Sequence, residues 1–171
     1  MGNNLIKKHA KSFYWASFFL SKEIFNKSSS LYNFCRTLDD IVDDDKNLEI
    51  KKENFLKFKK EFINRDKENT IIKEMWSIID KERISKQVVM DLFDGIQTDL
   101  EEKVKINSKK ELIIYSYRVA GTVGLMMSKI LKVNNKEALK GAIDLGIAMQ
   151  FTNIARDVCE DKARNRQYVK H

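Results

Sequence analysis

Apolar residues recur along most of this chain at intervals of three and four, the spacing that places side chains on one face of an α-helix. The pattern is clear where Phe55, Phe58 and Phe62 follow one another. Serine and asparagine precede several such stretches as N-cap candidates, and Ser108 with Glu111 has the spacing of a capping box. The pattern predicts about seven helices, over residues 5–25, 30–45, 51–64, 69–80, 85–104, 109–132 and 135–163.

The composition agrees with a helical protein. The 171 residues include no proline and only six glycines, which favours long helices over sheets and loops. A chain of this length has the size of one domain and can bury a sizeable core. No internal repeat, low-complexity tract or linker divides it. We therefore expect one all-α domain over residues 1–171.

Two acidic segments stand out against the apolar pattern. Asp39 and Asp43 lie four residues apart in the first segment, and Asp157 and Asp161 do so in the second. On a helix such residues lie one turn apart on one face, where like charges repel unless a cation neutralises them. Mg²⁺ is typically bound by one or two carboxylates together with substrate phosphates. The spacing indicates a metal-dependent enzyme for a phosphorylated substrate, and a solvated helix face is the alternative.

Other polar residues extend each acidic pair along the same face of its predicted helix. Tyr32 and Arg36 continue the first stripe, and Gln150 and Asn153 continue the second. Because apolar faces lie next to both stripes, this arrangement is typical of the lining of a cavity. The two stripes are therefore expected to face each other across a helical core.

Two glycines, Gly121 and Gly124, interrupt the predicted helix over residues 109–132. A glycine in a helix interior costs about 1 kcal/mol relative to alanine. Such a position normally means that a ligand or a second backbone comes close. The residues alone leave both explanations open.

The charge indicates an anionic partner. The net charge is +7 and the isoelectric point is near 9.3, which suits nucleic acid, anionic lipid or a phosphorylated small molecule. The lysines are scattered and no zinc spacing or RNA-binding signature accompanies them, so no nucleic-acid partner is expected. No segment has the run of about 20 apolar residues that a membrane span needs. Cys35 and Cys159 lack a CxxC partner and are expected in the core of a cytoplasmic protein. Peripheral association of the protein with the inner face of the membrane is an alternative that stays open.

Three segments together resemble the squalene/phytoene synthase family. They read NFCRTLDDIVDD, YSYRVAGTVGLMM and QFTNIARDVCED, and the similarity begins at His9 and covers essentially the whole chain. Members of this family join two prenyl diphosphates head to head within an isoprenoid synthase-type helical bundle around a central cavity. The second segment is most similar to that of bacterial phytoene synthases.

The resemblance implies roles for residues in all three segments and in the N-terminal region. The implied metal ligands, for Mg²⁺ or Mn²⁺, are Asp39, Asp43, Asp157 and Asp161. The implied residues at the reaction centre and around the diphosphates are Ser12, Phe13, Tyr32, Arg36, Tyr115, Gln150 and Asn153. The implied wall of the tunnel for the prenyl chain is formed by Val119, Ala120, Gly121, Val123 and Gly124.

The implied reaction joins two molecules of geranylgeranyl diphosphate to phytoene through a cyclopropylcarbinyl diphosphate, a step of carotenoid biosynthesis. The alternative within the family is a squalene or dehydrosqualene synthase that uses farnesyl diphosphate, and only squalene synthase would need NADPH. A head-to-tail prenyl transferase or a terpene cyclase would share the aspartate motifs, but the YRVAGTVG run argues against both.

The chain stops at His171, shortly after the second acidic segment. Family members continue with helices that close the cavity, so the resemblance implies a domain that is incomplete at its C-terminus. Such a chain is expected to self-associate or to need a partner chain. A non-catalytic helical fragment or subunit is the alternative of a different class.

Overall fold

The computed structural model describes residues 20–44 and 47–169, and most of them are helical. The helices are α3 (Lys22–Asp43), α4 (Leu48–Ile63), α5 (Thr70–Glu82), α6 (Lys86–Thr98), α7 (Lys109–Ser116), α8 (Thr122–Ile130), α9 (Lys136–Arg156) and α10 (Val158–Ala163). A π-helical turn, η1 (Tyr117–Gly121), joins α7 to α8. Two short strands, β1 (Val104–Lys105) and β2 (Arg166–Gln167), pair in parallel. The prediction of an all-α fold is confirmed.

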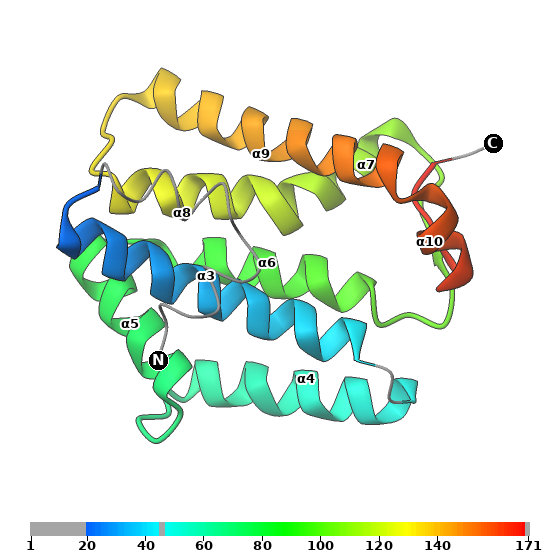
Figure 1. Cartoon of the computed structure of the whole chain (residues 1–171), viewed down its shortest axis with the longest axis horizontal. Helices are drawn as coiled ribbons and strands as arrows, with labels where there is room; N and C mark the ends of the chain where they lie inside the picture. Colours follow the sequence, from blue (N-terminus) through cyan, green and yellow to red (C-terminus); the bar gives the residue numbers. More distant parts are fainter. Residues whose placement is uncertain (1–19, 45–46, 170–171) are drawn as a thin grey trace.

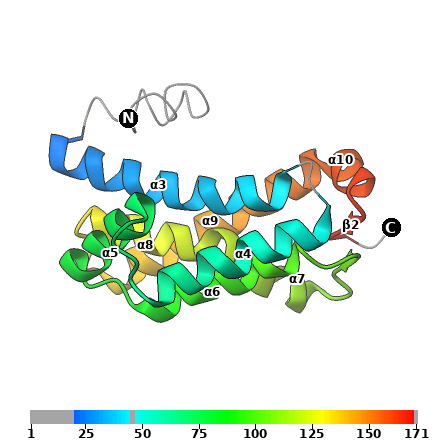
Figure 2. The same cartoon turned by 90° about the horizontal axis from the view of Figure 1, so that it is seen from below.

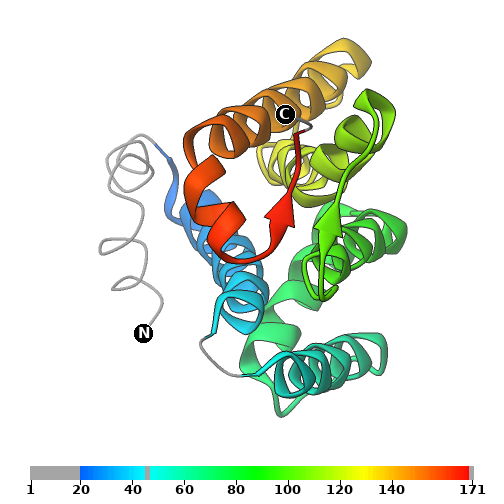
Figure 3. The same ribbon diagram turned by 90° about the vertical axis from the view of Figure 1, so that its right-hand side faces the viewer.

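The long helices lie side by side as a bundle. In Figure 1, α9 runs along one edge, α8 lies beside it, α3 and α6 occupy the middle, and α4 forms the opposite edge. In the view from below, α3 lies on one side of the bundle, with α6 and α8 on the other (Figure 2). The two strands lie next to each other at the end of the bundle that also holds α10 (Figure 3).

Side-chain caps fix where several helices begin. Ser108 Oγ accepts a hydrogen bond from the Glu111 backbone N–H at 3.1 Å, while a Glu111 carboxylate oxygen accepts one from the Asn107 N–H at 2.9 Å. The predicted capping box is thus confirmed, with its return bond made one residue earlier than usual. Caps of the same kind are formed by Ser21, Asn47, Asn69, Ser85 and Asn135.

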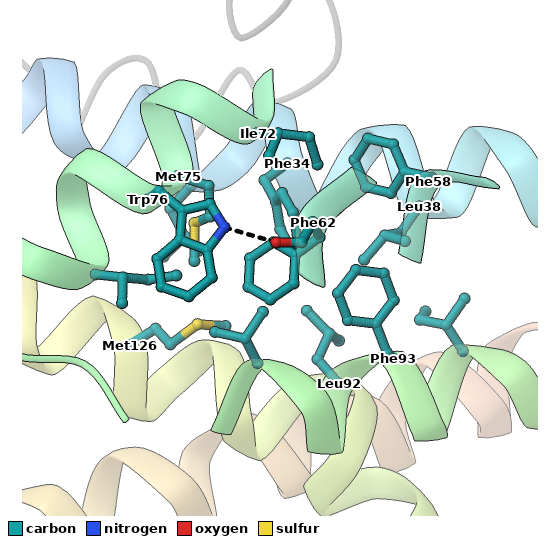
Figure 4. Close-up of a cluster of buried hydrophobic side chains, with 14 of the residues drawn as sticks. Phe34, Leu38, Phe58, Phe62, Ile72, Met75, Trp76, Leu92, Phe93 and Met126 are labelled. Atoms are coloured by element: carbon teal, nitrogen blue, oxygen red, sulfur yellow. Dashed lines mark hydrogen bonds between the residues drawn. The ribbon is translucent and has the colours of Figure 1, made fainter. Parts of the chain in front are cut away.

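An aromatic core holds α3 against α4, α5 and α6 (Figure 4). Phe34 of α3 is fully buried, and its ring centroid lies 5.6 to 5.8 Å from those of Phe58, Phe62 and Phe93. Trp76 of α5 stacks on Phe62 at 5.0 Å and donates its indole N–H to the Phe62 carbonyl at 2.8 Å. Because this core fixes the rotation of α3, it also fixes the direction in which the acidic stripe of α3 points.

Three predicted helix boundaries are wrong. No helix begins near residue 30, because Ser29 lies inside α3 and donates its hydroxyl to the Phe25 carbonyl at 2.8 Å, which satisfies it within the helix. The helix expected to reach residue 104 ends at Thr98, and the one expected to reach 163 ends at Arg156. Residues 5–19 of the first predicted helix lie outside the described residues.

Two further expectations meet different outcomes. Cys35 is half-buried but Cys159 is exposed on α10, so the prediction that both cysteines belong to the core is wrong for Cys159. Among the described helices, none combines the length and the apolar composition required to cross a membrane.

Candidate active site

An apolar cavity of about 670 Å³ lies between α3, α6, the α7–α8 segment and α9. Tyr32, Cys35 and Leu38 line it from α3, and Leu145 and Met149 line it from α9. Four of the five residues expected in the tunnel wall also line this cavity: Val119, Ala120, Val123 and Gly124. The fifth, Gly121, is buried and does not line this cavity.

A polar cavity of about 400 Å³ adjoins the apolar one at the end of the bundle near β1 and β2. Its lining includes all four aspartates expected to bind metal, together with four arginines: Asp39, Asp43, Asp157, Asp161, Arg36, Arg156, Arg164 and Arg166. The two cavities share six residues, which are Asp39, Ile96, Asp99, Tyr115, Gln150 and Asn153. We call these six residues the junction.

The apolar cavity extends along the bundle away from the junction. On α3 its lining runs from Asp39 back to Ser28, which is a helical length of about 16 Å at 1.5 Å per residue. On α9 it runs from Asn153 back to Ala142, over the same number of residues. The two helices therefore wall a space that is long, apolar and charged at one end only.

The glycines of this region permit backbones to touch. A Cβ on Gly124 would lie 2.3 Å from the Ala142 carbonyl oxygen of α9, and one on Gly121 would lie 3.2 Å from Cγ2 of Ile143, also of α9, and 3.0 Å from a ring carbon of Tyr117. Gly146 of α9 faces the Ala120 carbonyl oxygen in the same way, at 2.5 Å. Close packing of α9 on η1 and α8 thus explains the glycine at position 121. At position 124 two explanations hold, because Gly124 packs against α9 and also lines the cavity.

The carboxyl of Asp39 belongs to the junction. Its side chain is exposed where it faces the cavities, and the partial loss of water around it raises its pKa to about 7. Arg36 opposes the rise and the carboxylate of Asp43 adds to it. Arg36 itself pairs with the neighbouring Asp40 at 2.7 Å. A group that gains and loses a proton near neutral pH therefore lies where the two cavities meet.

Arginines pair with two of the predicted metal ligands. Asp43 Oδ1 accepts hydrogen bonds from Arg164 at 3.0 Å and from Arg166 at 3.3 Å. Asp157 forms a two-point contact with Arg156, at 2.7 and 2.6 Å, and this hydrogen bonding lowers the pKa of Asp157. The sequence did not indicate that these aspartates would be paired.

The pKa of Asp161 is shifted in the opposite direction from that of Asp157. Loss of solvent raises its pKa, against the lowering effect of Arg166.

Within the described ranges, no three His, Cys, Asp or Glu side chains lie close enough together to hold one metal ion. The four predicted ligands therefore share a cavity without forming one cluster. Carboxylate oxygens are nevertheless the donors that Mg²⁺ and Mn²⁺ prefer, and Mg²⁺ often binds through one or two carboxylates and substrate phosphates, so the donor set fits such an ion.

Tyr115, expected at the reaction centre, belongs to a buried hydrogen-bonded cluster. Its hydroxyl donates to the two carboxylate oxygens of Asp99, at 2.9 and 3.0 Å. The Tyr168 hydroxyl donates to the same carboxylate at 2.6 Å, and the two tyrosine rings stack at 4.9 Å. Burial raises the pKa of Asp99 to about 6, although both hydroxyls oppose this. Burial also raises the pKa of Tyr115 well above its ordinary value, so this phenol stays protonated.

Sequence reasoning missed Asp99, Arg166 and Tyr168. Asp99 follows the last residue of α6 and is its C-cap, where a polar residue is ordinary. Arg166 belongs to β2 and Tyr168 follows that strand directly, and both line the polar cavity together with Arg164 of the preceding turn. Because Arg164 and Asn165 form a turn and only Arg166 and Gln167 are strand residues, no regular spacing in the sequence indicated this arrangement. Ser12 and Phe13, also expected at the site, lie outside the described residues.

Comparisons with known proteins agree with this geometry. The family model for squalene/phytoene synthase matches residues 6–169. The phytoene synthase of Rhodobacter capsulatus is 31% identical over 169 residues, which cover 96% of this chain and 50% of that protein. Phytoene synthase 1 of Zea mays, a chloroplastic protein, is 31% identical over 175 residues, covering 96% of this chain and 42% of that protein.

The fold is shared with solved structures. A crystal structure of a dehydrosqualene synthase in complex with a ligand superimposes with a TM-score of 0.77 at 30% identity, covering 99% of this chain and 59% of that one. The chain therefore spans about half the length of the relatives that it matches. The match of the family model over nearly all residues shows that this chain belongs to the squalene/phytoene synthase family.

Proposed function

We propose that this chain acts in the head-to-head condensation of two prenyl diphosphates, with geranylgeranyl diphosphate as substrate and phytoene as product. The observation that carries the proposal is the junction, where a long apolar cavity opens into a cavity lined by aspartates and arginines. A prenyl diphosphate has the same two parts, a hydrocarbon chain and a highly charged head. The family relationship supports the same reaction class.

The polar cavity would receive the diphosphates. Asp39 and Asp43 from one side and Asp157 and Asp161 from the other would hold Mg²⁺ or Mn²⁺. When bound, such ions neutralise the diphosphate and draw electron density from it as it leaves. Arginine adds fixed positive charge with a planar donor geometry that matches phosphate oxygens.

The apolar cavity would hold the prenyl chain and protect the cation that forms when diphosphate departs. An allylic cation in contact with water is captured as an alcohol, so the walls must exclude solvent. Tyr32 lines this cavity, a few residues from Asp39 on α3. The face of an aromatic ring attracts a cation without forming a bond to it, which gives Tyr32 a stabilising role.

Each of the two chemical steps releases one proton. In the first, a double bond of one substrate attacks C1 of the other; one diphosphate and one proton leave, and a cyclopropylcarbinyl diphosphate remains. In the second, this diphosphate leaves, the skeleton rearranges and another proton is lost. Asp99 is the acceptor that we assign at the junction, because its pKa of about 6 leaves it ionised yet basic near neutral pH. Tyr115 donates to Asp99 and thereby fixes its orientation.

A second candidate is the formation of dehydrosqualene from farnesyl diphosphate. It is favoured by the match to the dehydrosqualene synthase structure, which covers nearly the whole chain. Both reactions would use the same residues, and the length of the prenyl chain distinguishes them.

A product assay with a separate binding measurement tests the proposal. The chain is incubated with Mg²⁺ and either geranylgeranyl or farnesyl diphosphate, and extracted hydrocarbons are identified. A hydrocarbon formed from the longer substrate should be phytoene; a product from farnesyl diphosphate alone would favour the second candidate. In parallel, Mg²⁺ with a non-hydrolysable diphosphate analogue should raise the melting temperature, because a ligand that binds only the folded state stabilises it.

The control for binding is the double variant Asp39→Asn with Asp157→Asn. It should lose the rise in melting temperature and keep the helical circular dichroism, because amides do not carry the charge that holds the metal. A rise of equal size in this variant would contradict the assignment of the polar cavity to metal and diphosphate.

A further inference from the structure

Two arginines converge on one oxygen of the polar cavity. Arg164 and Arg166 both donate to Asp43 Oδ1, at 3.0 and 3.3 Å. One carboxylate oxygen thus receives two guanidinium groups, and Arg164 also pairs with Glu160 at 3.2 Å. Arg166 is the more enclosed of the two, since its side chain is 12% exposed and that of Arg164 is 42% exposed.

The backbone that carries both arginines is anchored. The Val104 N–H donates to the Asn165 carbonyl at 3.2 Å, and the Ile106 N–H donates to the Gln167 carbonyl at 3.0 Å. Tyr168, which follows β2 directly, is buried and bonded to Asp99. These contacts on both sides of Arg166, and at Asn165 next to Arg164, hold the backbone of both arginines in place, so the flexible side chains are the parts that can move between partners.

The charges around the cavity give this movement a direction. Its lining carries five carboxylates and four guanidiniums. A divalent cation that binds Asp43 is repelled by the two guanidiniums already there, so it must displace them. An entering diphosphate has the opposite sign and offers phosphate oxygens that the guanidinium fork can bind at two points. Because Arg166 is largely enclosed, its displaced guanidinium remains inside the cavity.

We propose that Arg164 and Arg166 neutralise Asp43 while no divalent ion is bound, and transfer to the diphosphate of the substrate when the ion takes Asp43. The inference rests on the proposed function, because it needs both a metal and a diphosphate in the polar cavity. It assigns diphosphate binding to Arg166 of β2 and to Arg164 of the preceding turn, beyond the residues that the aspartate motifs contain.

The test measures two affinities by titration calorimetry on the 171-residue chain: that for Mg²⁺ alone, and that for inorganic diphosphate at saturating Mg²⁺. In Arg166→Gln the two should change in opposite directions. Binding of Mg²⁺ should tighten by roughly threefold, as the loss of one partly exposed competing ion pair implies. Binding of diphosphate should weaken by roughly tenfold, as the loss of a charge-assisted hydrogen bond implies.

Three other variants complete the design. Lys162→Gln removes the same charge nearby from a residue outside the lining of the polar cavity, and it should leave both affinities within about twofold of the unmodified chain. Arg166→Lys keeps the charge without the planar fork, so it should retain the Mg²⁺ affinity of the unmodified chain and bind diphosphate less tightly. Arg164→Gln repeats the test at the more exposed arginine, where a folding defect is least expected.

The outcomes separate the inference from the proposed function. Parallel weakening of both affinities in the arginine variants would show that the pairs are structural and would overturn the inference. Tighter Mg²⁺ binding with unchanged diphosphate binding would also overturn it, because no transfer would then occur. An unmodified chain that binds neither Mg²⁺ nor diphosphate would instead contradict the proposed function itself.

Discussion

The contact between α9 and η1 can be tested with two glycines of the same helix. A Cβ on Gly146 would lie 2.5 Å from the Ala120 carbonyl oxygen and 2.9 Å from the Gly121 nitrogen, both backbone atoms. Ordinary contacts begin near 3.4 Å, so α9 would have to retreat by about 0.9 Å, the difference between 3.4 and 2.5 Å. On Gly141, by contrast, a Cβ would meet no atom within 4 Å.

The two substitutions to alanine should therefore have opposite signs. Replacing glycine by alanine inside a helix gains about 1 kcal/mol, and this is the whole effect expected for Gly141→Ala. Overpacking typically costs about 1–3 kcal/mol. At Gly146 the contact is made by backbone atoms, which move away less easily than a flexible side chain does. We expect Gly146→Ala to lose about 1–2 kcal/mol in net stability, after the helix gain is included.

Thermal denaturation followed by circular dichroism measures the difference. For a chain of this size 1 kcal/mol corresponds to about 2–4 °C, so Gly141→Ala should melt higher by about that much and Gly146→Ala should melt lower by a similar or larger amount. Because Gln150 and Asn153 follow on the same helix, Gly146→Ala should also weaken diphosphate binding. If both variants melt higher, α9 does not pack on η1 as described, and its place in the cavity wall is refuted.

Three further predictions follow from single features. Burial raises the pKa of Asp99 from 3.8 to about 6, so the folded state binds this proton more tightly than the unfolded state and stability falls as pH rises from about 4 to about 6. Asp39, whose pKa is also raised, contributes to the same fall, so Asp99→Asn should reduce the slope of the melting temperature over this range without abolishing it, and an unchanged slope would refute the assignment. Trp76→Phe removes the indole hydrogen bond to the Phe62 carbonyl, which keeps its bond from the Arg65 N–H at 3.1 Å, and it should cost about 0.5–1.5 kcal/mol in the free energy of unfolding, measured with urea. Leu145 and Met149 are 62% and 60% exposed, so changing both to Gln should reduce binding of a hydrophobic dye, and equal dye fluorescence would place the exposed apolar surface elsewhere.

The sequence by itself determined the features that depend on neighbours along the chain. Helical spacing of apolar residues predicted an all-α fold, and the cap at Ser108 was confirmed, because a cap and its helix lie within a few residues of each other. The first acidic stripe was predictable for the same reason, since Asp39 and Asp43 lie four residues apart within α3. The second was predicted on one helix, but α9 ends at Arg156 and Asp157 lies between α9 and α10. Local reasoning failed at Ser29, where the packing of α3 continued the helix through a stretch of potential caps.

Only the tertiary structure decided what faces the stripes across the cavity. Asp99 and Tyr168 are separated by 69 residues, and their contact depends on the pairing of β1 with β2. That pairing also brings Arg166 to Asp43. The sequence left two explanations for Gly121, and the approach of Tyr117 and Ile143 selected packing. The physical reason is the range of the forces involved: a helix is set by bonds between residues four apart, whereas a cavity is set by side chains that meet only after the helices have packed.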